Sequence, residues 1–263
     1  MSDPTDLDLL LLAADIADRE SMRTWRSDDL EVEIKPDGSP VSAADKLIER
    51  LLRELLAEHR PGDRILGEEE GEQEGEQDGD TGSGARRWVL DPIDGTGSYV
   101  AGRRAWGSLI ALEVDGAPTA GMVTMPAVGR RWWGTVGGGA FCTERPGAAP
   151  VAIGVSDRST PGELRWSSGP SVDELDEDER ARIARFDRLG RYVPMSEWTT
   201  YPALMVADGS LDLAVHFGQH WDHAALAGVV VAAGGRVVDD AAPSDGRRWA
   251  ATFTNGRIDL GDR

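Results

Sequence analysis

A buried-strand pattern that ends in two aspartates constrains this chain most. The stretch LDPIDGTG (90–97) follows the apolar run RWVL (87–90) and places Asp91 and Asp94 three residues apart around Pro92. Because Asp, Pro and Gly are common turn residues, a strand running into a turn is the simpler explanation when the spacing is taken alone. A carboxylate at a buried strand end is costly, however, unless it is paired or metal-bound. Other parts of the sequence are therefore needed to distinguish a simple turn from a functional site at these two aspartates.

Strand and helix patterns are mixed along the chain. Residues 46–59 carry apolar side chains at the spacing of one helix face, and residues 107–126 show two apolar runs joined by a short DGAP turn, typical of a β-hairpin. The elements do not follow the regular repeat of a Rossmann domain. They predict an α/β (α+β) fold, with further helices over 7–25, 171–189 and 222–235 and strands over 64–69 and 87–91.

The chain length bounds the number of domains. Its 263 residues suffice for one large core or two tightly joined halves. No internal repeat and no linker long enough to separate domains is present. We therefore expect a single domain over 1–263, with an N-terminal half of about 1–145 and a C-terminal half of about 146–263.

Composition and charge exclude several functions. The formal net charge of −19 argues against binding nucleic acid by phosphate neutralisation. The first twenty residues match neither a signal peptide nor a membrane span, so no membrane partner is expected. The single cysteine, Cys142, permits no intrachain disulfide and fits a reducing compartment, which predicts a cytoplasmic protein.

Further acids stand where apolar elements end or begin. Glu68 follows RILG (64–67), Asp222 opens the apolar helix predicted at 222–235, and Asp45 lies in the first turn of an earlier helix that Ser42 can cap. If these positions converge with the two aspartates of the DPID stretch, they form a hard, oxygen-rich site suited to Mg²⁺. Backbone N–H groups after Gly95 would then face a phosphate, if a helix opens there.

Four motifs together resemble the inositol monophosphatase family of metal-dependent phosphatases. WVLDPIDGT (88–96) is similar to the central motif of that family, and WDHAALAGVVVAAGG (221–235) to its C-terminal W-D-x-A motif. ILGEE (65–69) resembles the strand that supplies a metal-binding glutamate, and KPDGSPVSAAD (35–45) the N-terminal segment. The resemblance spans roughly residues 7–257 and implies a layered αβαβα sandwich, usually a homodimer.

The resemblance also implies roles for individual residues. It implies Mg²⁺-dependent hydrolysis of a small-molecule phosphate monoester by a metal-activated water, with two to three ions per active site. Glu68 and Thr96 are implied to orient and deprotonate the water, and the amides of Gly95 and Thr96 to hold the phosphate. The implied metal ligands are Glu68, Asp91, the Ile93 carbonyl, Asp94, Asp222 and, through water, Asp45.

Within the family, residues 51–69 and 107–141 most resemble the actinobacterial histidinol-phosphate phosphatases, so histidinol phosphate is the first substrate that we expect. Two acids of the substrate pocket are replaced, one by Val215 and one of a Gly-Asp pair by Thr199. Inositol 1-phosphate or another sugar, nucleotide or specialised-metabolite phosphate is therefore the alternative. The residues expected to contact the substrate are Glu197, Trp198 and Thr199.

Two other interpretations concern the catalytic status of the chain and its acidic stretch. A non-catalytic module that binds a phosphorylated ligand is the alternative from another functional class, although such a relative would normally have lost an acid or Thr96, and all are present. The low-complexity stretch 68–80 predicts a mobile loop over Glu70 to Asp80, after a ligand at Glu68.

Overall fold

The computed structural model describes residues 3–36, 38–75, 85–144, 147–196, 200–239 and 248–260. Its helices are α1 (Asp6–Thr24), α2 (Ala43–His59), α3 (Thr96–Val100), α4 (Glu177–Ala184), α5 (Pro202–Ala207) and α6 (His220–Ala232), with 3₁₀ turns η1 (Val172–Glu174) and η2 (Asp187–Leu189). Its strands are β1 (Val32–Ile34), β2 (Pro40–Ser42), β3 (Arg64–Gly67), β4 (Gly71–Gln73), β5 (Arg86–Asp94), β6 (Gly107–Val114), β7 (Ala117–Met125), β8 (Arg130–Thr135), β9 (Gly139–Thr143), β10 (Val151–Ile153), β11 (Leu164–Gly169), β12 (Gly190–Tyr192), β13 (Leu213–Gly218), β14 (Arg236–Asp239) and β15 (Trp249–Thr254).

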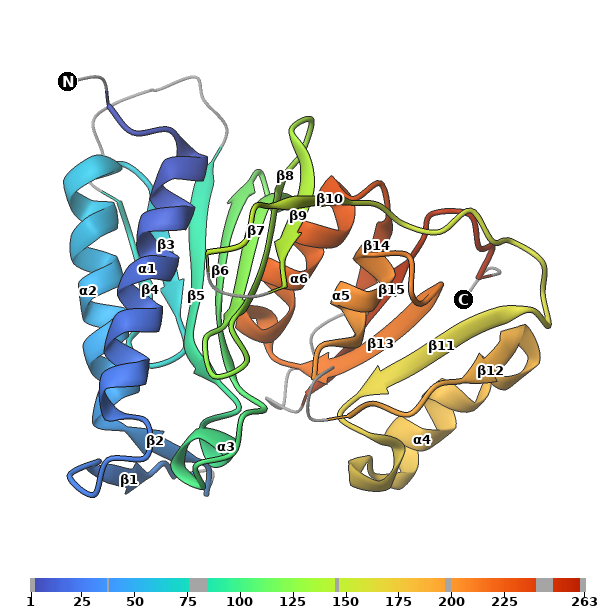
Figure 1. Cartoon of the computed structure of the whole chain (residues 1–263), viewed down its shortest axis with the longest axis horizontal. Helices are drawn as coiled ribbons and strands as arrows, with labels where there is room; N and C mark the ends of the chain where they lie inside the picture. The colour runs from blue at the N-terminus through green and yellow to red at the C-terminus, as the bar shows by residue number, and fades with distance from the viewer. Residues whose placement is uncertain are drawn as a thin grey trace.

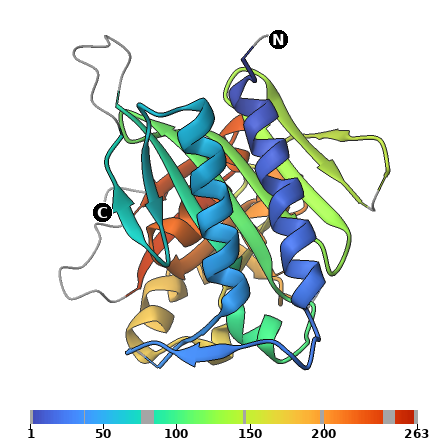
Figure 2. The same ribbon diagram turned by 90° about the vertical axis from the view of Figure 1, so that its left-hand side faces the viewer.

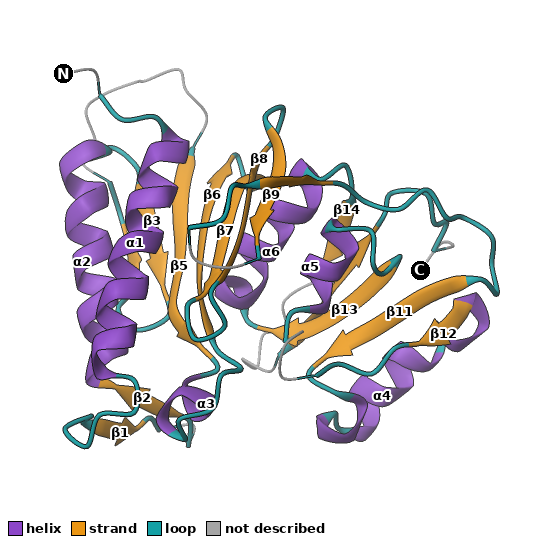
Figure 3. Cartoon of the chain, in the orientation of Figure 1, coloured by secondary structure: helices purple, strands orange, loops and turns teal. Residues whose placement is uncertain are grey.

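These elements stack in five layers, as Figures 1 and 3 show. Helices α1 and α2 cover the outer face of a first sheet, α5 and α6 lie between that sheet and a second one, and α4 covers the far face of the second sheet. The layered αβαβα arrangement predicted from the sequence is confirmed. No helix among the described residues is both long and apolar enough to cross a membrane.

The first sheet has eight strands in the order β10-β9-β8-β7-β6-β5-β3-β4. Only β3 and β5 pair in parallel, and the hairpin predicted over 107–126 is the antiparallel pair β6 and β7. Figure 2 looks onto this side of the molecule, with α1 and α2 side by side across the strands. The second sheet has the order β12-β11-β13-β15-β14, with β11 parallel to both of its neighbours.

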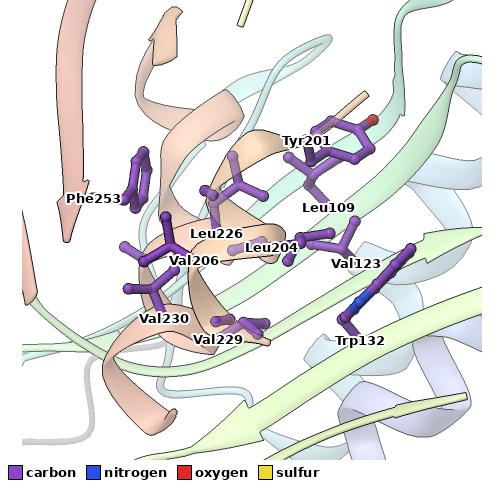
Figure 4. Close-up of a cluster of buried hydrophobic side chains, with 14 of the residues drawn as sticks. Leu109, Val123, Trp132, Tyr201, Leu204, Val206, Leu226, Val229, Val230 and Phe253 are labelled. Atoms are coloured by element: carbon purple, nitrogen blue, oxygen red, sulfur yellow. The ribbon is translucent and has the colours of Figure 1, made fainter. Parts of the chain in front are cut away.

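Three buried apolar clusters fill the spaces between the layers. One lies between α1, α2 and the first sheet, and a smaller one between α4 and the second sheet. The third surrounds α5 and α6 and is shown in Figure 4. Helix α6 approaches β7 closely there, since a Cβ on Gly228 would lie 2.4 Å from the Ala120 carbonyl oxygen.

Helix α2 begins as its sequence predicts. Ser42 is the N-cap, and its N–H and hydroxyl donate to the Asp45 carboxylate at 2.8 and 2.6 Å. The apolar side chains of Ile48, Leu52 and Leu56 are buried against the first sheet. Beside them runs a second buried stripe, which is polar and spaced by four residues: Asp45, Glu49 and Arg53.

Two predicted elements differ from the structure. The helix expected over 171–189 is confined to α4, because Ser171 and Asp176 each form a separate capping box and divide the segment. The loop expected from Glu70 onward contains β4, which pairs with β3. Arginines on the neighbouring strands offset its acids, as in the 2.6 Å ion pair between Arg64 and Glu72. Residues 76–84 lie outside the described residues.

Candidate metal centre

The end of β5 places two aspartates on the same side of the first sheet. Pairing between β5 and β6 is irregular between Asp91 and Asp94, so the strand bulges between them. The Ser108 hydroxyl donates to the Pro92 carbonyl oxygen at 2.6 Å and anchors the bulge. Asp91 is 1% exposed, whereas Asp94 is partly buried at the strand end.

Helix α6 brings a third aspartate to the same point. One carboxylate oxygen each from Asp91, Asp94 and Asp222 lie within 4.8 Å of one another. The Gln219 N–H donates to Asp222 Oδ2 at 2.6 Å, so the carboxylate also caps the helix. A Cβ on Gly218 would lie 2.3 Å from this same oxygen, so a glycine is required beside it.

The charge of Asp91 is not offset by its surroundings among the described residues. Both Asp91 carboxylate oxygens are buried without a hydrogen-bond partner there. Burial, together with the charges of Glu68, Asp94 and Asp222, raises the pKa of Asp91 well above its usual range. Burial raises the pKa of Asp94 to about 6 and that of Asp222 to about 8, the latter with a contribution from Asp94. Orphaned carboxylate oxygens of this kind fit a hard divalent cation.

Glu68 follows β3 directly and lies beside the cluster. Its N–H donates to the Leu90 carbonyl oxygen at 3.1 Å, which fixes the backbone next to β5. Its carboxylate accepts a 2.8 Å hydrogen bond from Lys35 Nζ, which also donates to Glu69 at 2.8 Å. Although burial lowers the pKa of Lys35, these two hydrogen bonds raise it above its ordinary value, so this lysine is a permanent cation at the edge of the site.

Thr96 links the turn after β5 to helix α2. Its hydroxyl lies 2.9 Å from the Ile93 carbonyl oxygen and 3.3 Å from Asp45 Oδ1, and its one proton can be donated to either. Burial raises the pKa of Asp45 to about 6, opposed by the hydrogen bonds from Ser42 and assisted by the charge of Glu68. Gly95 precedes α3 with a φ of 80°, a conformation that favours glycine.

The structure thus gathers the acids predicted from the sequence around one point, with Thr96 and Asp45 beside them. The three residues predicted to contact the substrate, Glu197, Trp198 and Thr199, lie outside the described residues. Val215, which replaces an expected pocket acid, is 1% exposed and packs in the apolar cluster beneath α4.

The histidines near Asp222 contact other groups. His220 Nε2 lies 2.9 Å from Glu113 Oε1 and 3.1 Å from an Arg87 guanidinium nitrogen, which ties the start of α6 to β5 and β6. The rings of His216 and His223 meet edge to face, with centroids 5.4 Å apart. Burial lowers the pKa of His216 to about 4, so its ring is neutral at pH 7.

Sequence reasoning did not identify four residues around the site. Lys35 begins the segment 35–45, which also contains the predicted ligand Asp45. A basic residue in that segment could have been expected to pair with one of the acids, as Lys35 does with Glu68. Tyr201 is buried near Asp94. Burial raises the pKa of its hydroxyl, and the charge of Asp94 raises this pKa further. The pair Glu49 and Arg53 lies beside the apolar face predicted for α2.

Comparisons with known proteins agree with this arrangement. The family model described as "Inositol monophosphatase family" matches residues 9–257. The chain is 39% identical to a histidinol-phosphatase of Streptomyces coelicolor, over 96% of this chain and 93% of the relative. It is 38% identical to a histidinol-phosphatase of Mycobacterium tuberculosis, over 96% and 94%. Among solved structures, extragenic suppressor protein SuhB of Bartonella henselae matches with a TM-score of 0.72 and 25% identity, covering 95% of this chain and 94% of that chain.

Proposed function

The chain belongs to the inositol monophosphatase family, and from this premise we propose that it hydrolyses a small-molecule phosphate monoester in a metal-dependent reaction. The observation that carries the proposal is the group of buried Asp91 with partly buried Asp94 and Asp222, in which both Asp91 carboxylate oxygens have no hydrogen-bond partner among the described residues. A phosphate dianion would be repelled by such a group unless bound cations reverse the local charge. Mg²⁺ is the proposed cation, because the donors are all hard oxygens.

The proposed ligands divide between two principal ions and a weaker third. Glu68, Asp91 and the Ile93 carbonyl would hold one ion, and Asp91, Asp94 and Asp222 the second. Asp45, assisted by Glu68, would hold the third through water. When bound, Mg²⁺ lowers the pKa of a coordinated water and neutralises charge on the phosphate.

The remaining chemistry belongs to side chains and amides of this chain. In this proposal the Glu68 carboxylate would accept a proton from the attacking water, and the Thr96 hydroxyl would orient that water. The amides of Gly95 and Thr96 face the phosphate in this proposal. Lys35 holds the Glu68 side chain through its 2.8 Å hydrogen bond.

Histidinol phosphate is the first substrate that we propose, because the two histidinol-phosphatases match nearly the whole chain. Inositol 1-phosphate is the alternative, since Val215 and Thr199 replace acids expected in the pocket. The experiment is a panel of phosphate monoesters, including histidinol phosphate, inositol 1-phosphate and adenosine bisphosphate, ranked by kcat/KM with and without Mg²⁺. Release of phosphate that requires Mg²⁺ supports the proposal.

The same panel tests the non-catalytic alternative. If no ester releases phosphate above background with any divalent ion, the chain is a module that binds a phosphorylated ligand.

We further propose that the protein forms a homodimer in the cytoplasm and acts as one domain over 1–263. Light scattering of the purified chain tests the dimer.

A further inference from the structure

Glu49 is a fully buried carboxylate that reaches from α2 to the turn carrying Glu68. Its Oε2 accepts the N–H of Glu69 at 2.8 Å, and its Oε1 accepts the N–H of Glu70 at 3.0 Å. These are the two backbone groups that directly follow the proposed ligand. The carboxylate therefore holds the turn at the point where a displacement would move the Glu68 side chain.

Arg53, one helical turn further along α2, keeps this carboxylate in place. Its Nε and one terminal nitrogen donate to Glu49 Oε1 at 3.0 and 2.7 Å. The same terminal nitrogen donates to the Gly71 carbonyl oxygen at 2.6 Å, and the other to the Gln73 side chain at 3.1 Å. The pair thus contacts both the turn after Glu68 and strand β4. Arg53 also compensates the buried charge of Glu49.

The residue before Glu68 leaves room for this contact. A Cβ on Gly67 would lie 2.1 Å from Glu49 Oε1 and 2.7 Å from an Arg53 nitrogen. A side chain there would push the carboxylate away from the turn. The glycine is consequently a requirement of the contact and not of the backbone conformation.

One helix thus carries a proposed ligand and the support of another. Asp45, Glu49 and Arg53 follow one another at four-residue intervals and form the buried polar stripe of α2. The Glu68 backbone is held on its other side by β5, through the Leu90 carbonyl oxygen. We propose that Glu49, held by Arg53, is a positioning residue that fixes the Glu68 carboxylate relative to Asp45 and the β5 aspartates. This inference rests on the metal-dependent function proposed above.

The test compares Glu49→Gln with a matched control, Asp212→Asn. Glutamine keeps the volume but has one acceptor oxygen, so it cannot accept both N–H groups and Arg53 together. Asp212 is also completely buried and also accepts a backbone N–H and an arginine, at 2.7 Å from Arg165 and 2.9 Å from Arg158, but it directly precedes β13 of the second sheet. Both variants are first checked for folding by circular dichroism.

Mg²⁺ alone is titrated into each protein by calorimetry, and amide exchange of the peptide covering residues 68–73 is measured without metal. We expect Glu49→Gln to weaken Mg²⁺ binding about 10- to 100-fold, to accelerate exchange in that peptide, and to lower kcat at saturating Mg²⁺ by a smaller factor. Asp212→Asn should leave all three unchanged within about twofold.

Mg²⁺ affinity within about twofold of wild type in Glu49→Gln overturns the proposal, as does an equal loss in Asp212→Asn. If Glu49→Gln does not fold, Gly67→Ala displaces the same carboxylate with α2 intact and must give the same changes. Failure of the proposed function is seen separately, as a wild-type protein that hydrolyses no phosphate ester, since calorimetry and amide exchange need no turnover.

Discussion

Two buried aspartates in this molecule have opposite surroundings. Asp212, directly before β13 of the second sheet, accepts hydrogen bonds from the Ser156 hydroxyl, the Arg158 guanidinium and the Arg165 N–H. Asp91, in the first sheet, is equally hidden from solvent but has no hydrogen-bond partner among the described residues. Its neighbours are other carboxylates, which raise its pKa further.

The difference shows that burial alone does not separate a structural acid from a functional one. An acid whose charge is compensated holds neighbouring segments together, as Asp212 does for β11 and the chain before it. An acid surrounded by like charges destabilises the fold until a cation binds, and such groups concentrate at functional sites. Four experiments test this contrast.

The largest expected effect is on catalysis at the uncompensated cluster. Asp94→Asn removes the charge of one proposed ligand at nearly constant volume, so kcat should fall at least about 100-fold, or ~2.7 kcal/mol. The melting temperature of the metal-free protein should not fall, because a like charge has been removed. Steady-state assays and thermal melts measure both effects. A variant that keeps more than about a tenth of wild-type kcat would contradict the ligand role.

The compensated acid should behave in the opposite way. Asp212→Asn leaves the guanidinium of Arg158 and the N–H of Arg165 with a weaker, neutral acceptor, so the free energy of unfolding should fall by about 2 kcal/mol. The kcat at 25 °C should stay within about twofold of wild type, because the residue is remote from the cluster. Urea unfolding provides the measurement. A loss below about 0.5 kcal/mol would mean that the hydrogen bonds of Asp212 add little.

A pH series should separate Asp222 from ordinary carboxylates. Its pKa rises to about 8 in the folded, metal-free protein, so below about pH 4 it is protonated in both states and stabilises fully. As the pH rises toward 8, the unfolded chain ionises first and the wild type loses stability. The melting temperature of Asp222→Asn relative to wild type should therefore rise from pH 4 to pH 8 in EDTA. A constant difference would mean that Asp222 ionises normally.

The smallest effect is expected from the acids of residues 76–80, which lie outside the described residues and belong to the stretch predicted from the sequence as a mobile loop. Neutralising Glu76, Asp78 and Asp80 together should raise the Mg²⁺ concentration for half-maximal rate by less than about twofold at low salt. The change should vanish near physiological ionic strength, where the Debye length is about 8 Å. Assays at two salt concentrations test this. A large drop in kcat at saturating Mg²⁺ would instead identify one of these acids as a ligand.

Sequence patterns predicted a mixed α/β fold and acids at the ends of apolar runs, and the resemblance to the inositol monophosphatase family implied the layers. Asp91, Asp94 and Asp222 each terminate or open a buried element, and this placement is visible in the linear sequence. The extent of α4 and the existence of β4 were not predicted. The first depends on competing caps at Ser171 and Asp176, and the second on arginines that reach it from β3 and β5.

The polar stripe of α2 was missed for a different reason. Glu49 and Arg53 fall beside an apolar face at helical spacing, and an ion pair four residues apart on a helix is usually a solvated surface feature. The β3–β4 turn packs over them and covers them from solvent. A sequence contains the side chains of such a contact but not the turn that covers it.

The position of α6 between the two sheets bears on how the protein assembles. Asp91 and Asp94 belong to the first sheet, whereas Asp222 arrives on a helix that the chain forms much later and that packs against β7. A nascent chain that has made only the first sheet would therefore have an open, weakly binding site. A cation that requires all three carboxylates binds the finished protein and not the half-formed one, and so favours completion by mass action. Binding of a cation to the three aspartates would then depend on the packing of α6 into the core, and would stabilise the chain only once that packing is complete.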